Sequence, residues 1–176
     1  VALYNQGRDA EVKPLLYEAI EISRRINQPR NLAGALGNLG GIFKREGQYE
    51  EALKLFMQGL ETHRNTGYPY GIAIALDNVG TAYYYLGNER EALYYLRQSI
   101  REARDIKADF IALDALVWVA GIRARSGERK FAVELLRMIR HNPKTDPETV
   151  QRIEEFLSNL AVGINLKKIQ DVAEES

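Results

Sequence analysis

The stretch Gly47–Ala52 (GQYEEA) determines the fold of this chain, because it returns at intervals of forty residues. It recurs as Gly87–Ala92 (GNEREA) and again as Gly127–Ala132 (GERKFA), and Gly7 lies forty residues before Gly47. A repeat of this length is typical of stacked supersecondary units that bury one continuous core between neighbours. Stacked units of this kind usually bind other molecules, so the repeat indicates a binding protein.

Each unit predicts two amphipathic helices with the glycine between them. Apolar residues recur at helical spacing before Gly47 (Leu32, Leu36, Leu39, Phe43) and after it (Ala52, Leu55, Phe56, Leu60). The glycine suits a turn that needs a positive φ, and Pro29 and Pro69 suit the first turn of a leading helix. The predicted helices span 9–26, 30–45, 49–65, 70–86, 89–106, 109–125 and 129–141, and Gly7 is placed in a turn.

The composition limits the classes of partner. The 176 residues include 24 Lys plus Arg and 24 Asp plus Glu, so the net charge is zero. This balance argues against direct binding to nucleic acid or to a membrane surface, both of which favour a basic excess. No stretch has the length and apolarity of a membrane span. The chain has no cysteine, which excludes disulfides and fits a reducing cytoplasm, where we expect the protein to reside.

The forty-residue pattern stops after His141. Asp146 and Pro147 follow a short linker and suit the N-cap and first position of a further helix. An apolar stripe through Ile153 and Phe156 predicts that this helix, near 147–161, covers the exposed end of the stack. The predicted organisation is repeats over 1–141 (1–28 partial, 29–68, 69–108, 109–141), a linker and capping helix over 142–161, and a loose tail over 162–176. Because 1–28 is half a repeat, we expect a fragment of a longer protein.

Small residues recur inside the predicted helices. Gly40, Gly80 and Ala120 form one column, and Ala52, Ala92 and Ala132 form another. A glycine inside a helix costs about 1 kcal/mol relative to alanine, so a repeated one indicates close packing of helices. The helix over 30–45 holds four glycines (Gly34, Gly37, Gly40, Gly41), which favours tight helix packing over the alternative, the close approach of a ligand.

The repeating columns resemble a tetratricopeptide repeat. The residues that carry the resemblance are Leu39-Gly40, Phe43, Gly47, Ala52 and Phe56, with their counterparts one unit later. The unit has 40 residues instead of the usual 34 and carries an Asn in its leading helix. It is therefore similar to the long-repeat subgroup found in kinesin light chain, and to the sensor repeats of bacterial signal-transducing ATPases and maltose-activator-like regulators. The resemblance implies an all-α fold in which antiparallel helix pairs stack into a right-handed solenoid, with the leading helices lining its concave face.

Asn38 and Asn78 are the leading candidates for a site in that concave groove. An amide side chain both donates and accepts hydrogen bonds, so two of them one repeat apart could hold an extended peptide backbone. The resemblance also implies a peptide-binding role for an Asn at this place, which Trp118 occupies in the last repeat. The alternative is that each Asn braces a neighbouring helix.

Other polar and aromatic residues of the leading helices complete the predicted groove. Lys44, Arg45 and Arg125 predict positive charge, and the aromatic residues predict anchoring surface, which together suit an acidic or aromatic peptide. The alternative is an ordinary solvated face. The full candidate set is Asn38, Gly41, Lys44, Arg45, Asp77, Asn78, Thr81, Tyr84, Tyr85, Asp114, Trp118, Gly121 and Arg125.

The sequence predicts binding and not catalysis. Its two histidines, His63 and His141, lie near the ends of trailing helices, and no metal-binding, nucleotide-binding or paired-cysteine motif is present. We therefore expect no cofactor, no metal and no enzyme activity. The leading prediction is a protein- or peptide-binding scaffold. The alternatives are a small-ligand sensor attached to an ATPase or DNA-binding domain, and a self-association module.

Overall fold

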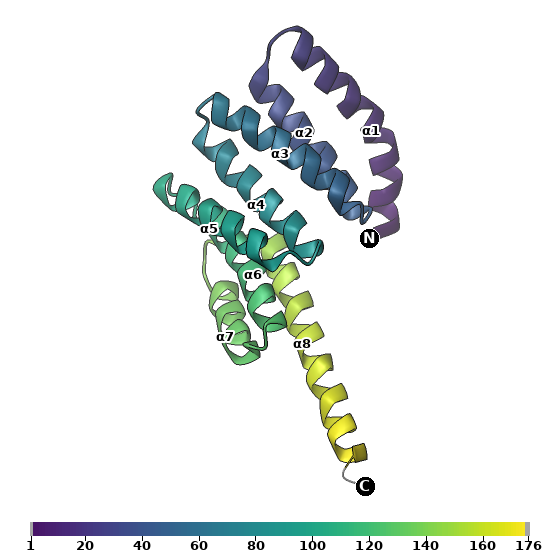
Figure 1. Cartoon of the computed structure of the whole chain (residues 1–176), viewed down its shortest axis with the longest axis vertical. Coiled ribbons are helices and arrows are strands. Elements are labelled where there is room, and N and C mark those ends of the chain that lie inside the picture. The colour runs from purple at the N-terminus through teal and green to yellow at the C-terminus, as the bar shows by residue number, and fades with distance from the viewer. Residues whose placement is uncertain (1, 175–176) are drawn as a thin grey trace.

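The computed structural model describes the backbone of residues 2–174 and the side chains of residues 8–161. That part of the chain forms eight helices and no strand, which confirms the predicted all-α solenoid of antiparallel helix pairs. Each helix packs on the next one along the chain (Figure 1). In order, the helices are α1 (Ala2–Arg25), α2 (Pro29–Arg45), α3 (Tyr49–Asn65), α4 (Pro69–Tyr85), α5 (Glu89–Asp105), α6 (Asp109–Arg125), α7 (Arg129–Arg140) and α8 (Pro147–Glu174).

A residue with positive φ closes every turn between α1 and α7. At the end of α2, the Gly47 N–H donates to the carbonyl of Lys44 (3.1 Å) and the Gln48 N–H donates to that of Phe43 (2.9 Å). This is the Schellman arrangement, which satisfies the last carbonyls of a helix and reverses the chain. The positive-φ residues recur every twenty positions: Asn27, Gly47, Gly67, Gly87, Lys107 and Gly127.

The small-residue columns allow leading and trailing helices to approach closely. A Cβ atom added at Gly40 would lie 2.6 Å from the ring of Phe56 in α3. One repeat later, a Cβ atom at Gly80 would lie 2.7 Å from Leu96 in α5. A large residue opposite a glycine therefore fills each junction, and any added volume there would overpack it.

The two ends of the chain differ from the sequence-based expectations. The turn predicted at Gly7 is wrong, because α1 runs without interruption from Ala2 to Arg25. The segment after residue 161, predicted as a loose tail, is helical as far as Glu174. Pro147 begins α8 as predicted, and no proline follows it. Gly163, a residue type that often ends a helix, lies within α8 and does not end it. The tail residues 175–176 lie outside the described part.

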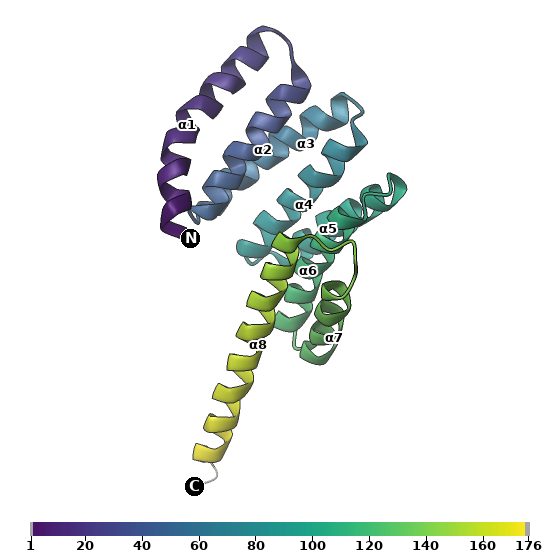
Figure 2. The same cartoon turned by 180° about the vertical axis from the view of Figure 1, so that it is seen from behind.

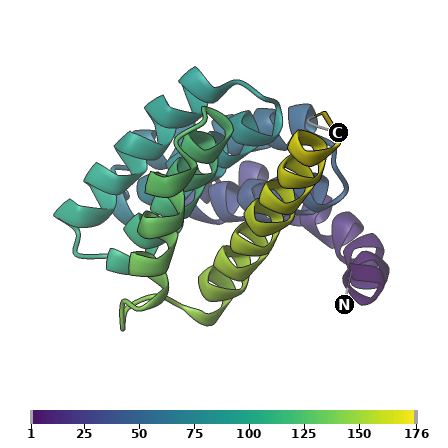
Figure 3. The same cartoon turned by 90° about the horizontal axis from the view of Figure 1, so that it is seen from below.

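The first half of α8 is the part that closes the stack. The Asp146 carboxylate caps it by accepting the Thr149 N–H (2.9 Å), and Ile153 is fully buried against residues of α6 and α7. The second half extends away from the helix pairs (Figures 1 and 2). Figure 3 shows that α8 lies beside the stack and does not continue it as another repeat. Its first turns therefore reach the inner face of the leading helices.

Candidate functional site

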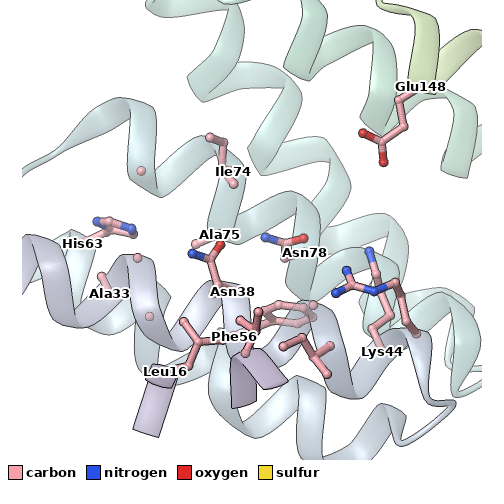
Figure 4. Close-up of a pocket in the computed structure, with 18 of the residues that line it drawn as sticks. Leu16, Ala33, Asn38, Lys44, Phe56, His63, Ile74, Ala75, Asn78 and Glu148 are labelled. Carbon is pink, nitrogen blue, oxygen red and sulfur yellow. The ribbon is translucent and has the colours of Figure 1, made fainter. Parts of the chain in front are cut away.

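A groove of about 1150 Å³ lies along the inner face of α2 and α4. The helices α1 and α3 also contribute side chains to it, and the first turns of α8 form an opposite wall. Figure 4 shows Asn38 and Asn78 in the middle of this groove, with His63 toward one end and Lys44 toward the other. The structure therefore brings the two leading candidates into one open site.

Asn38 and Asn78 occupy the same position in consecutive leading helices, and both line the groove. Asn38 is exposed and Asn78 is half-buried. Within the described residues, neither side chain forms a hydrogen bond with the protein. The bracing role considered for these residues would require such bonds. Both amides are therefore available to a molecule that enters the groove.

The glycines of α2 serve two different purposes. Gly40 packs against Phe56, as the tight-packing interpretation predicts. A Cβ atom at Gly34 or Gly37 would instead meet nothing within 4 Å, and one at Gly41 would meet only Arg45, at 3.8 Å. These three glycines line the groove, so they leave the helix backbone uncovered where a ligand can approach it.

The basic residues at the end of α2 are engaged with acidic neighbours. Arg45 forms a two-point ion pair with Asp9 of α1, through Nη2 to Oδ1 (2.6 Å) and Nε to Oδ2 (2.9 Å). The hydrogen bonds from Arg45 hold the pKa of Asp9 below its usual range. Lys44 is partly buried, and burial lowers its pKa while the nearby carboxylate of Asp77 opposes that effect. The predicted positive rim is thus largely neutralised by the protein itself.

Asp77 lies in α4 beneath this rim and is not part of the groove lining. Its Oδ1 atom is buried and has no hydrogen-bond partner among the described residues. Burial raises the pKa of this carboxyl to about 6, against the opposing attraction of Lys44 and Arg152. One helical turn further on, Thr81 is fully buried and its hydroxyl also lacks a partner among those residues. Asp77, which is half-buried as a whole, and the fully buried Thr81 therefore each have a buried oxygen with unmet hydrogen-bonding capacity.

The aromatic candidates lie in a packed cluster outside the open groove. Tyr84 and Trp118 are only 5% and 4% exposed, and the ring of Phe156 from α8 packs against both. Tyr85 stacks on Tyr49 with ring centroids 4.7 Å apart. The resemblance placed these residues in the concave face. Tyr84 and Trp118 are covered because α8 folds back onto that face at α4 and α6, whereas Tyr85 stays 40% exposed.

Arg125, Asp114 and Gly121 also serve internal contacts. The Arg125 guanidinium lies 3.7 Å from the centre of the Tyr84 ring and donates to the Tyr84 carbonyl oxygen at 2.9 Å. Asp114 accepts hydrogen bonds from Arg152 and from Thr149 of α8. A Cβ atom at Gly121 would lie 2.8 Å from the ring of Phe156, so this glycine makes room for α8.

Two groups of groove residues were missed by reasoning from the sequence. The first is the polar face of α8, which was expected to be exposed because it lies opposite the apolar stripe. Its groove residues are Glu148, Gln151, Arg152 and Glu155. No signal within α8 distinguishes a groove wall from an exposed face. The second group lies near the starts of α2 and α4 and comprises Arg30, His63, Tyr68, Tyr70 and Ile74. The positions 30 and 70 share one place in the repeat, which is the signal that could have found them.

Two kinds of feature are absent from the described residues. No helix there is both long enough and apolar enough to cross a membrane. No group of three or more histidine or acidic side chains is arranged to hold a metal ion in that part of the chain.

Comparison with known proteins agrees with this architecture. A family model described as tetratricopeptide repeat matches residues 31–105. One similar solved structure is a crystal structure of nearly identical TPR-like repeats of a protein described as a kinesin light chain from Podosopora anserina. It superposes on this chain with a TM-score of 0.64 at 18% identity, and the match covers 98% of this chain and 88% of that one. A single-substitution variant of those repeats gives a TM-score of 0.63 at 18% identity, covering 99% and 93%. A comparison with curated proteins gives no match. Residues 31–105 thus match the tetratricopeptide repeat model, and the chain has the fold of a TPR-like solenoid.

Proposed function

We propose that this chain is a protein-binding scaffold whose groove holds a peptide segment of a partner. The observation that carries the proposal is the pair Asn38 and Asn78, which lie in one open groove with no hydrogen bond to any described residue. Tetratricopeptide repeats commonly act as protein-interaction modules, which supports binding over catalysis.

The chemistry of the pair suits an extended backbone. Each amide offers a carbonyl acceptor and an NH₂ donor, which matches the N–H and C=O of a peptide group. Two amides on consecutive leading helices can therefore hold two separate peptide groups of one extended ligand chain. The uncovered backbone at Gly34 and Gly37 lets that chain lie close to α2. The groove is suited to reading a peptide mainly through its backbone.

An array of short peptides, probed with the full chain, tests the proposal. We expect a subset of peptides to bind, and the double variant Asn38→Ala plus Asn78→Ala to weaken that binding on the order of tenfold or more. The matched control is Asn65→Ala plus Asn159→Ala, because both residues are exposed and lie outside the groove. Peptides that bind the Asn38/Asn78 variant as tightly as the native chain would overturn the role of the pair.

Other outcomes of the same work would favour the alternatives. Thermal stabilisation by small metabolites, with no peptide bound, would favour a small-ligand sensor. A mass that rises with concentration in light scattering, with no peptide bound, would favour self-association. Either result would contradict a peptide-binding groove.

A further inference from the structure

The two ends of the groove differ in chemistry. Figure 4 shows Lys44 and Glu148 toward one end and His63 toward the other, with the two asparagines between them and Ile74 on the side of Asn38. The first end carries charged side chains from α1, α2 and α8. The second carries aromatic and aliphatic side chains from α3 and α4 and the loop between them. It also carries Arg30 of α2, whose guanidinium lies 5.0 Å from the centre of the Tyr68 ring. Each end would therefore select a different part of a bound peptide.

The charges of the first end are balanced within the protein. Arg45 is paired with Asp9 at 2.6 Å, and Arg152 contacts both Asp114 and Glu148. Lys44 is attracted by the buried carboxylate of Asp77. An acidic ligand side chain would have to compete with these internal carboxylates for the same cations. Charge complementarity at this end is thus already satisfied without a ligand.

The second end presents apolar surface that the protein does not cover. Tyr70 is 39% exposed and Ile74 is 36% exposed, and they lie one helical turn apart on the same face of α4. The Tyr68 ring lies 6.1 Å from the Tyr70 ring and extends this surface. We call Tyr68, Tyr70 and Ile74 the apolar rim. Neighbouring exposed apolar residues beside a groove are typical of an interaction surface.

Two residues of the apolar rim lie in one row with Asn78 along α4. Tyr70, Ile74 and Asn78 follow one another at intervals of four residues along α4, which places each about 6 Å from the next. An extended peptide advances roughly 3.3 Å per residue, so about two residues separate its contact with Asn78 from its contact with Ile74. One ligand chain can therefore meet both features.

We propose that the groove selects a peptide with an uncharged aliphatic or aromatic side chain that docks on the apolar rim, while its backbone crosses Asn38 and Asn78. This inference rests on the proposed peptide-binding function and adds the chemistry of the ligand. It replaces the acidic peptide expected from Lys44, Arg45 and Arg125, because the protein uses those charges itself. Aromatic and aliphatic anchors that fill such a surface carry much of the binding energy at interfaces.

The test uses the full chain and a peptide array in which neutral apolar and acidic sequences are equally represented. We expect the bound peptides to be enriched in neutral sequences with an aliphatic or aromatic residue. Their affinity should change by less than about twofold when the salt concentration rises, because screening weakens mainly charge pairs. Acidic bound peptides whose affinity falls steeply with salt would overturn the inference.

A variant pair makes the test specific to the rim. Tyr70→Ala plus Ile74→Ala should weaken peptide binding on the order of tenfold. The matched control, Tyr94→Ala plus Met138→Ala, removes one exposed tyrosine and one exposed aliphatic side chain from trailing helices. Binding that depends on Asn38 and Asn78 but not on the rim would overturn this inference alone. Binding that depends on neither would overturn the proposed function as well.

Discussion

The inner faces of α2 and α6 occupy equivalent places in the repeat, yet one is open and the other is covered. Asn38 in α2 corresponds to Trp118 in α6, and Gly41 corresponds to Gly121. The α2 residues line an open groove. Trp118 and Gly121 are buried, with the ring of Phe156 packed against them. The same position of the repeat thus lines an open groove in one unit and packs against the capping helix α8 in another.

The difference comes from what each inner face offers to a helix. Asp114 in α6 supplies a carboxylate for Arg152 and Thr149, whereas α2 has Gly34 at that position. Trp118 supplies a broad apolar surface where α2 has a polar amide. The α6 face therefore matches the amphipathic first half of α8, and the α2 face does not. A few side chains per repeat decide whether the chain covers its own groove.

The largest expected effect comes from removing the contact that covers α6. Phe156→Ala should lower the free energy of unfolding by about 3 kcal/mol, near the low end for a buried phenylalanine because Phe156 is only half-buried. Trp118 is the only tryptophan, and its ring lies 5.7 Å from that of Phe156, so its fluorescence reports the change directly. Urea denaturation followed by Trp118 emission measures both effects.

Phe131→Ala is the control for that variant. Phe131 is 51% exposed and lies on α7, so its removal should change the stability by less than about 0.5 kcal/mol. If the two variants were equally stable and the Trp118 emission did not move, Phe156 would not hold α8 on the inner face.

The open face was more predictable from the sequence than the covered one. Helices α2 to α7 were predicted to within a residue or so, because apolar spacing, proline and glycine all repeat with one period. Asn38 and Asn78 could be placed in one groove for the same reason. Their position depends only on the repeat, and no described residue from outside the repeat covers them.

The covered face could not be predicted, because its contacts come from outside the periodic part. Arg152 reaches Asp114 from 38 residues away, and no period links α8 to α6. Trp118 and Tyr84 therefore looked like groove residues until the position of Phe156 was known. The contact between the Arg125 guanidinium and the Tyr84 ring could not be predicted for a related reason, because it joins side chains of two different repeats.

A second test compares two acidic residues of leading helices, Asp77 of α4 and Asp114 of α6. The folded-state pKa of Asp77 is about 6, above the ordinary 3.8, because burial disfavours its charge. The protonated form of Asp77 therefore stabilises the folded state. This contribution to the free energy of unfolding is complete below about pH 4 and is lost as the pH rises through about 6. Asp77→Asn should remove this loss and raise the stability at pH 7 by about 2 to 3 kcal/mol.

The measurement is the difference in unfolding free energy between the native chain and Asp77→Asn from about pH 4 to about pH 8. Asp114→Asn is the counterpart on the covered face, and it should destabilise the protein at neutral pH because it weakens the contact with Arg152. A difference between native and Asp77→Asn that does not vary with pH would show that Asp77 is not a strained, buried carboxyl.

The smallest expected effect sets Gly41 directly against Gly121. Gly41→Ala should stabilise the chain by about 1 kcal/mol, because alanine favours the helix and its Cβ would meet only Arg45, at an ordinary contact distance of 3.8 Å. Gly121→Ala gains the same helix propensity but places a Cβ 2.8 Å from Phe156 and 3.2 Å from the Tyr84 hydroxyl, so we expect a net loss of about 1 kcal/mol. Thermal unfolding of both variants measures the contrast. A loss of stability in both would mean that the inner face of α2 is packed and not open. A Gly41→Ala chain that is more stable but binds peptides less tightly would show that this glycine serves the ligand at the expense of the helix.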